Sequence, residues 1–275
     1  PLSANITLSE IKEKITNSTK GIIPVHMAGY PCDMAEIKKF CDDNNLILIE
    51  DCAHGLGSYI SDKHVGNFGL CGNFSFYPTK QVTTGEGGMI ICNDKEFFDK
   101  VTKLKAFGID TPPELRGKPG IYDVSELGYN YRMTDFQAAL GAGQMSRYES
   151  NLLRRKKNAK LYSTLLSELD EITYLPYSDN NSYFLFQILL SDSIDRDDFL
   201  SCLKGNGIGF SIHYATPVPL MSYYRKKYNF KSEQFPNAFN YGLQSVSLPV
   251  HPKLNESDIV YVCETVKKYI SSKSL

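Results

Sequence analysis

The chain has 275 residues, of which 42% are apolar and 22% charged, and its formal net charge is −1. These values are typical of globular proteins, and they give no reason to expect nucleic acid or an anionic membrane as a partner. No apolar run approaches the ~18 residues that suggest a membrane helix.

The first part of the sequence predicts alternating helices and strands. A capping-box pattern opens a helix over residues 7–15, and a strand follows over residues 21–26. Asp33 begins a helix that ends near residue 43, and the apolar run 46–50 predicts a strand covered on both faces. Since this alternation favours parallel strands joined by right-handed crossovers, we expect a mostly parallel sheet.

Residues 71–88 form the most informative segment. Residues 73–77 predict a short buried strand, which Pro78 stops, and Lys80 follows two residues later beside a glycine-rich stretch. A lysine in this position is poorly hydrated, so its amine loses a proton readily. An uncharged amine attacks carbonyl groups, which makes Lys80 a candidate nucleophile.

Two carboxylates, Glu50 and Asp51, stand at the end of the strand 46–50, and in open parallel sheets ligands bind at that edge. Pyridoxal phosphate needs a lysine for its aldehyde, a carboxylate for its ring nitrogen and donors for its phosphate. Lys80, Asp51 and Ser75 fit these three roles, with Asp51 keeping the ring nitrogen protonated. Glu50 has the weaker claim of the two carboxylates.

Later segments predict a further strand, a helix, a loop and a long helical stretch. The strand is Gly88–Cys92, the helix covers residues 95–107, and residues 108–125 are rich in Gly, Pro and charge, which predicts a surface loop. A second capping box at Thr134 opens one amphipathic helical stretch, whose apolar residues are Phe136, Leu140, Met145 and Tyr148.

From about residue 170 onward the pattern predicts a small α/β domain with its own core. Its expected strands cover residues 182–190, 208–213 and 246–250. Its expected helices cover residues 196–204, 236–243 and 256–270.

Six stretches together make the chain resemble the DegT/DnrJ/EryC1/StrS family of nucleotide-sugar aminotransferases. They are residues 23–26, 50–54, 74–80, 85–88, 127–134 and 212–214, in the order found in the family. The resemblance implies the type I pyridoxal-phosphate aminotransferase fold, an α/β fold with a mostly parallel sheet. It divides the chain into an incomplete large cofactor-binding domain, residues 1–165, and a small C-terminal domain, residues 166–275.

The resemblance also implies roles for side chains beyond Lys80, Asp51 and Ser75. His54 would reach the phenolate oxygen of the cofactor, where the family usually has glutamine and some branches have histidine; ordinary packing is the alternative. Asn130 would reach across a homodimer to the phosphate of the partner, so that the active sites are shared. No metal is implied.

His213 and Tyr214 begin a Tyr- and Pro-rich stretch that lines the sugar-nucleotide site in the family. A core strand followed by a turn explains these two residues equally well. The implied reaction moves an amino group from glutamate to a nucleotide-linked keto-6-deoxy sugar. A 4-keto sugar is favoured, because His26, His54 and residues 212–214 resemble the 4-aminotransferase branch.

Two alternatives stay open. A related group of sugar dehydratases carries histidine in place of the cofactor lysine, and Lys80 argues against that group. Family members also have a leading segment with a phosphate-binding turn, and nothing here matches it. The chain is therefore expected to be N-terminally truncated, and a catalytically silent fragment or regulatory relative is the other alternative. The scattered cysteines, at positions 32, 41, 52, 71, 92, 202 and 263, form no C-x-x-C pair and fit a reducing, cytoplasmic environment.

Overall fold

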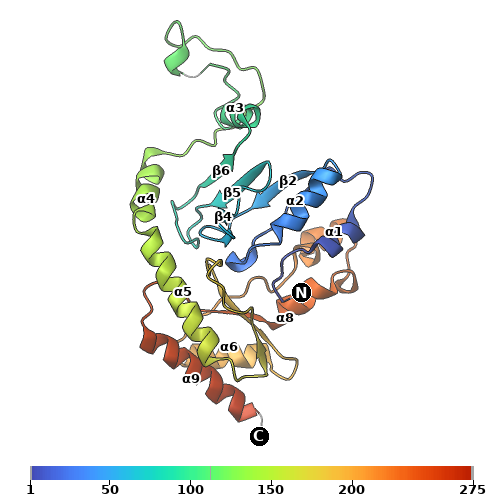
Figure 1. The fold of residues 1–275 in the computed structure, drawn as a ribbon, viewed down its shortest axis with the longest axis vertical. Coiled ribbons are helices and arrows are strands. Elements are labelled where there is room, and N and C mark those ends of the chain that lie inside the picture. Colours follow the sequence, from blue (N-terminus) through green and yellow to red (C-terminus); the bar gives the residue numbers. More distant parts are fainter. Residues whose placement is uncertain (1, 112, 274–275) are drawn as a thin grey trace.

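The computed structural model describes residues 2–111 and 113–273, which Figure 1 shows as a ribbon. Its helices are α1 (Leu8–Lys14), α2 (Met34–Asp43), α3 (Lys95–Leu104), α4 (Asp135–Met145), α5 (Tyr148–Leu165), α6 (Arg196–Gly205), α7 (Ser222–Tyr228), α8 (Pro236–Gln244) and α9 (Glu256–Lys273). Its strands are β1 (Gly21–Ile22), β2 (Ile47–Asp51), β3 (Tyr59–Ile60), β4 (Lys63–His64), β5 (Cys71–Ser75), β6 (Gly88–Cys92), β7 (Ile172–Thr173), β8 (Phe186–Leu190) and β9 (Ser245–Leu248).

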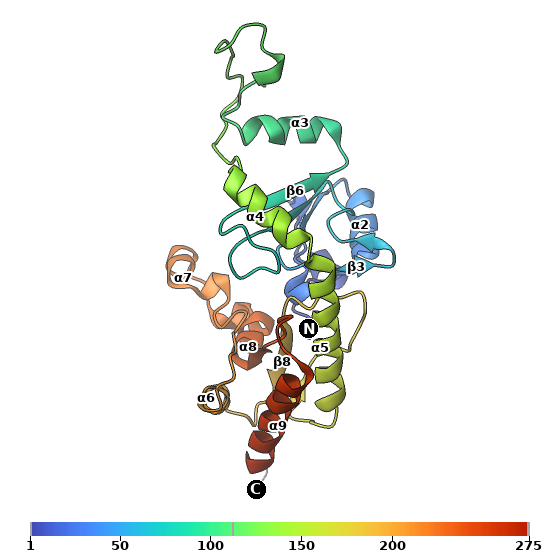
Figure 2. The same ribbon diagram turned by 90° about the vertical axis from the view of Figure 1, so that its left-hand side faces the viewer.

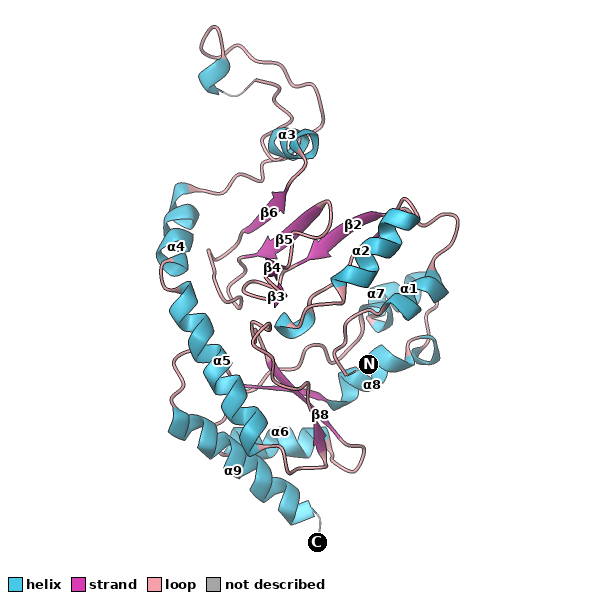
Figure 3. Ribbon diagram, in the orientation of Figure 1, coloured by secondary structure: helices cyan, strands magenta, loops and turns pink. Residues whose placement is uncertain are grey.

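The first sheet has the strand order β1–β2–β5–β6. As the sequence predicts, β1, β2 and β5 run parallel; β6 runs antiparallel to β5 (Figure 3). The first strand is shorter than the expected 21–26, because Pro24 has no N–H to give to a ladder. The parallel register sets Asp51 opposite Asn73, so the C-terminal ends of β2 and β5 meet at one edge of the sheet.

A glycine-rich connection returns the chain from Lys80 into β6. Gly85 and Gly87 have positive φ angles of 79° and 149°, which residues other than glycine rarely adopt. Gly88 pairs with Ser75, and a Cβ atom at Gly88 would come within 2.7 Å of the Phe74 carbonyl oxygen. These glycines are structural, and they allow a close turn next to the lysine.

The second sheet, β7–β8–β9, is antiparallel and packs with α5, α6 and α9 around a large apolar core. Met27 and Tyr30, which follow β1, are buried in this same core and link it to the first sheet. The predicted strand 208–213 is wrong: within it only Ser211 pairs, as a single bridge to Ser247. Gly207 precedes this segment and Gly209 lies within it, and neither offers a side chain to pack on a sheet. The division of the chain after residue 165 stays a prediction.

The expected single helical stretch after Thr134 is two helices, since the chain leaves α4 at Ser146 and begins α5 at Tyr148. The predicted capping box is present, because Thr134 and Gln137 bond to each other's backbone N–H groups. In contrast to the amphipathic expectation, α4 buries no side chain, and Phe136 is 91% exposed.

The segment between α3 and α4 stands away from the body of the molecule, as expected of a surface loop (Figures 1 and 2). We refer to residues 105–145, this segment together with α4, as the arm. None of the helices in the described part of the chain combines the length and apolarity that crossing a bilayer demands.

Candidate active site

Lys80 lies one turn beyond the end of β5. Its backbone N–H donates to the Tyr77 carbonyl at 3.0 Å, and its side chain is half-buried. The Nζ atom lies 5.1 Å from the centre of the Phe184 ring. Burial lowers the pKa of the Lys80 amine, and the Asp51 charge opposes this shift. The amine is therefore easier to deprotonate than a lysine in water.

Asp51 ends β2, and hydrogen bonds hold both its backbone and its side chain. Its N–H donates to the Pro24 carbonyl at 2.9 Å, and its Oδ1 accepts from the Ala53 N–H at 2.9 Å. No direct ion pair joins Lys80 to Asp51 among the described residues. The two groups nevertheless act on each other through their charges, so the structure holds them near each other but apart.

His54 is buried beside Lys80. Its Nδ1 accepts from the Ala28 N–H at 3.4 Å, and its ring stacks on Phe184 with centres 4.4 Å apart. Burial, followed by the charges of Lys80 and His213, lowers the pKa of His54 to about 3. His54 is consequently uncharged at neutral pH.

The structure also brings His213 and Tyr214 to this place. The His213 ring lies 6.5 Å from that of His54, and its Nδ1 is 3.3 Å from the Ser247 hydroxyl. Burial and the Lys80 charge lower the pKa of His213, and burial and the Asp51 charge raise the pKa of Tyr214. These residues come from the segment after α6, so a part of the chain beyond the first sheet also contributes to the site.

Ser75 and Asn130 differ in their placement. Ser75 Oγ, at the end of β5, accepts from the Tyr77 N–H at 3.3 Å, and no acceptor among the described residues takes its own hydroxyl hydrogen. Asn130 is exposed in the arm, where its Oδ1 accepts from Arg132 Nε at 3.3 Å. No described contact joins Asn130 to Lys80, Asp51 or Ser75 within the chain.

A buried polar cluster lies directly behind the site. Glu50 is fully buried, and its carboxylate accepts from the N–H groups of Gly66 (2.7 Å), Phe68 (2.6 Å) and Gly69 (2.9 Å) and lies 3.2 Å from His26 Nε2. Burial raises the pKa of Glu50, but these hydrogen bonds, with the one to His26 first, lower it by more, so the net shift is downward.

Glu50, His26 and Cys52 could geometrically surround a metal ion, since their ligand atoms lie within 4.8 Å of one another. The nitrogen and carboxylate atoms are already engaged, however: His26 Nδ1 accepts from the Cys32 N–H at 3.1 Å, and Glu50 holds three backbone amides. The cluster therefore fixes the loop that follows β4 and the end of β2.

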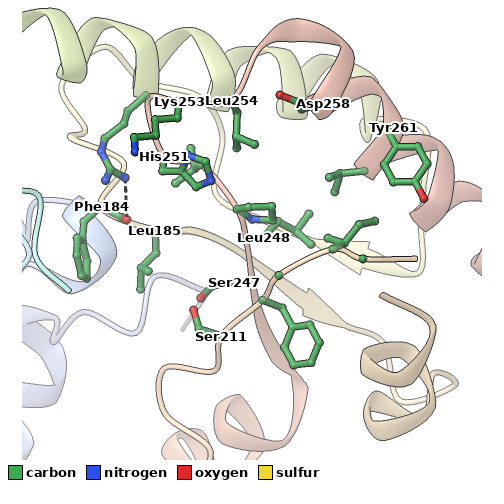
Figure 4. Close-up of a pocket in the computed structure, with 18 residues that line it drawn as sticks. Phe184, Leu185, Ser211, Ser247, Leu248, His251, Lys253, Leu254, Asp258 and Tyr261 are labelled. Atoms are coloured by element: carbon green, nitrogen blue, oxygen red, sulfur yellow. Dashed lines mark hydrogen bonds between the residues drawn. The ribbon is translucent and has the colours of Figure 1, made fainter. Parts of the chain in front are cut away.

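Sequence reasoning missed Phe184, which lies against both Lys80 and His54. The only signal was an aromatic residue in an apolar stretch, which ordinarily indicates core packing. Phe184 also borders a cavity of about 670 Å³, which does not include Lys80 (Figure 4). On the side of α5, Arg155 NH1 donates to the Tyr183 and Phe184 carbonyls, each at 3.3 Å.

The site residues present fit pyridoxal phosphate. They offer a poorly hydrated amine, a carboxylate held apart from it and a hydroxyl whose hydrogen is free to be donated. These are the groups that the aldehyde, the ring nitrogen and the phosphate require.

Comparison with known proteins agrees with this chemistry. The model of the DegT/DnrJ/EryC1/StrS aminotransferase family matches residues 1–267. GDP-perosamine synthase of Escherichia coli O157:H7 is 34% identical over 269 residues, which are 98% of this chain and 70% of that protein. Helicobacter pylori PseC, an aminotransferase involved in the biosynthesis of pseudoaminic acid, superposes with a TM-score of 0.90 at 27% identity, covering 99% of this chain and 72% of PseC.

The PLP form of Spr1654 from Streptococcus pneumoniae superposes with a TM-score of 0.85 at 27% identity, covering 98% of this chain and 73% of that one. The expected fold class, the type I aminotransferase fold, is confirmed by these structures. The chain therefore belongs to the DegT/DnrJ/EryC1/StrS aminotransferase family, whose members are pyridoxal-phosphate-dependent sugar aminotransferases.

Proposed function

We propose that this chain moves the amino group of glutamate to the keto carbon of a nucleotide-linked 6-deoxy sugar, and that the sugar is a 4-keto sugar. The observation that carries the proposal is the convergence of Lys80, Asp51 and His54 at the C-terminal ends of β2 and β5. GDP-perosamine synthase, at 34% identity, supports a nucleotide sugar as the acceptor.

Each side chain has a defined task in this proposal. Pyridoxal phosphate, when bound, supplies a reactive aldehyde and a ring that withdraws electrons. Asp51 keeps the ring nitrogen protonated, and Ser75 donates its hydroxyl hydrogen to the phosphate. Lys80 Nζ, with its lowered pKa, anchors the aldehyde and, once released, moves the proton at the amino-bearing carbon of the substrate.

The proposal extends to a homodimer with shared active sites. Large apolar side chains of the arm are exposed, namely Leu115, Leu127, Tyr131 and Phe136, with exposures of 72%, 83%, 72% and 91%. Exposed patches of this kind mark surfaces that another protein covers. Asn130 lies on the same arm, where it would reach the phosphate in a second copy. We also propose a cytoplasmic location, on the strength of the scattered cysteines.

A covalent labelling experiment tests the Lys80 assignment. We expect the purified protein to gain a visible absorbance band when pyridoxal phosphate is added, and borohydride reduction to attach the cofactor to the peptide that carries Lys80. Lys80→Ala should lose the band and lower turnover by a factor of roughly 10³ or more, because both the anchor and the proton carrier are removed.

Lys63→Ala is the matched control, since Lys63 is exposed on β4 and lies over the Phe68 ring, away from the site. It should keep the band and the label. A label on any residue other than Lys80 would contradict the assignment. Incubation with glutamate and a nucleotide-linked 4-keto sugar then separates an aminotransferase, which forms 2-oxoglutarate and an amino sugar, from a dehydratase or a silent relative.

A further inference from the structure

The Phe184 side chain contacts three polar groups of the candidate site at once. Its ring stacks on His54 at 4.4 Å, lies 5.1 Å from Lys80 Nζ and meets the edge of His213 at 6.5 Å. It is only 6% exposed. Nothing in the proposed reaction uses this ring directly, so its place among these groups needs a separate explanation.

The backbone around Phe184 is fixed from two sides. Arg155 holds the carbonyl of Phe184 at 3.3 Å from the side of α5. The next N–H, that of Leu185, donates to the Ala28 carbonyl at 3.2 Å. Ala28 in turn donates its own N–H to His54 Nδ1. Ala28 therefore links the backbone next to Phe184 to the ring of His54 through its carbonyl and its N–H.

These contacts determine where the proton of His54 resides. Because Nδ1 accepts a hydrogen bond from a backbone N–H, the neutral ring must carry its hydrogen on Nε2. No partner for Nε2 occurs among the described residues, so this N–H is free to donate. A flip of the ring about its Cβ–Cγ bond would put Cδ2 in the place of Nδ1 and break this hydrogen bond, so that the tautomer would no longer be fixed. The stacking contact with Phe184 opposes such a flip.

We propose that Phe184 is a positioning residue, which holds the His54 ring in one orientation with its Nε2–H free for an oxygen acceptor on the bound cofactor or substrate, and which covers Lys80 Nζ. The inference rests on the proposed function for its catalytic consequence. The orientation of His54 itself is a property of the chain. A misplaced donor next to the reacting atoms costs rate even when the ligand still binds.

The test is an NMR measurement of the His54 ring nitrogens in the protein without added cofactor, with His54→Gln used to assign the signal. In the wild type we expect one tautomer, with the hydrogen on Nε2, between pH 8 and pH 5. Phe184→Leu keeps apolar volume but removes the aromatic face. It should give a mixture of tautomers and a ring that titrates closer to ordinary histidine.

Phe184→Tyr restores an aromatic face and should restore the single tautomer. Phe184→Met provides the same comparison if the leucine variant does not fold. Phe199→Leu is the matched control, because Phe199 is a fully buried ring in α6 that contacts Tyr269. It should leave the His54 signal unchanged. A single Nε2–H tautomer in folded Phe184→Leu, or an equal disturbance by Phe199→Leu, would overturn the proposal.

In the loaded enzyme, Phe184→Leu should lower kcat by roughly tenfold to a hundredfold with little change in the KM for glutamate. The two proposals fail separately. Absence of a borohydride label on Lys80 in the wild type would refute the aminotransferase assignment and leave the tautomer measurement intact. Normal labelling together with an unperturbed His54 in Phe184→Leu would refute only the role of Phe184.

Discussion

The cluster around Glu50 and the arm of residues 105–145 are built in opposite ways. Glu50 is fully buried, and its carboxylate accepts from three backbone amides and lies beside His26. On the arm, Leu127 and Phe136 are 83% and 91% exposed. Contacts within one chain therefore fix the polar groups of the Glu50 cluster. The same chain leaves apolar surface of the arm uncovered.

The difference teaches which parts of the site a single chain completes. Lys80, Asp51 and His54 stand next to the Glu50 cluster, so their positions follow from the fold of the chain. Asn130 belongs to the arm, where its role depends on what covers that surface. Four changes test this contrast, and they run from the largest expected effect to the smallest.

Glu50→Ala should be the most damaging change. It leaves buried amides and His26 without their acceptor, and loss of one partner from a buried charged network costs about 3–5 kcal/mol of the free energy of unfolding. Denaturant unfolding measures this loss. Asp43→Ala is the control, because it removes an exposed ion pair with Lys39 and should leave the free energy of unfolding nearly unchanged. Equal losses in the two variants would show that the cluster is not the fixed part.

Substitutions on the arm should weaken dimer formation and leave the folding of the single chain unchanged. Leu127→Ser together with Phe136→Ser removes two apolar side chains, each worth about 1.5–3 kcal/mol when buried against a partner. We expect the proposed dimer to weaken by a factor of at least about a hundred in sedimentation experiments, with little change in unfolding of the monomer. Leu153→Ser, 67% exposed on α5, should leave the dimer intact. A monomeric wild type would remove the basis of this prediction.

Acid should lower the free energy of unfolding through His54, which stands next to the Glu50 cluster. Its folded pKa is about 3 and its ordinary value is 6.5, so the unfolded chain binds a proton that the folded chain refuses. The free energy of unfolding contributed by this group is therefore fully present above pH 6.5 and is lost as the pH falls below it, by at most about 1.4 kcal/mol per pH unit. His54→Gln should give a shallower decline between pH 7 and pH 5, and parallel declines would contradict the shift.

Thr134→Ala should have the smallest effect. It removes the capping box of α4, which is worth about 1 kcal/mol. Since α4 buries no side chain in the chain itself, the loss should appear as faster hydrogen exchange in α4 and not as a lower global stability. Thr7→Ala, which removes the equivalent box of α1, is the comparison, because Ile11 of α1 is buried. An equal global loss in both variants would contradict the contrast.

Much of the site was predictable because strand ends are visible in a sequence. The apolar run before Asp51, and Pro78 just before Lys80, indicate where β2 and β5 end. The parallel register then brings those ends together. His54 follows three residues after Asp51, so predicting the end of β2 also predicts that His54 lies at the same edge of the sheet.

Other features depend on contacts between distant segments, which local pattern does not contain. Phe184 had the pattern of a core residue, and only the hydrogen bond from Leu185 to Ala28 places it against His54. The segment 208–213 has the composition of a strand, yet no neighbouring strand pairs with more than Ser211. Phe136 has helical apolar spacing, but no surface among the described residues covers it.

The loop held by Glu50 has a consequence for how this protein can vary in length. The amides of Gly66, Phe68 and Gly69 converge on one carboxylate, and a Cβ atom at Gly72 would come within 2.3 Å of the Gly66 Cα atom. One inserted residue would pull at least one amide out of reach. The tip of the arm has no such constraint, so insertions that homologues have accumulated should be found there and be absent from residues 66–69.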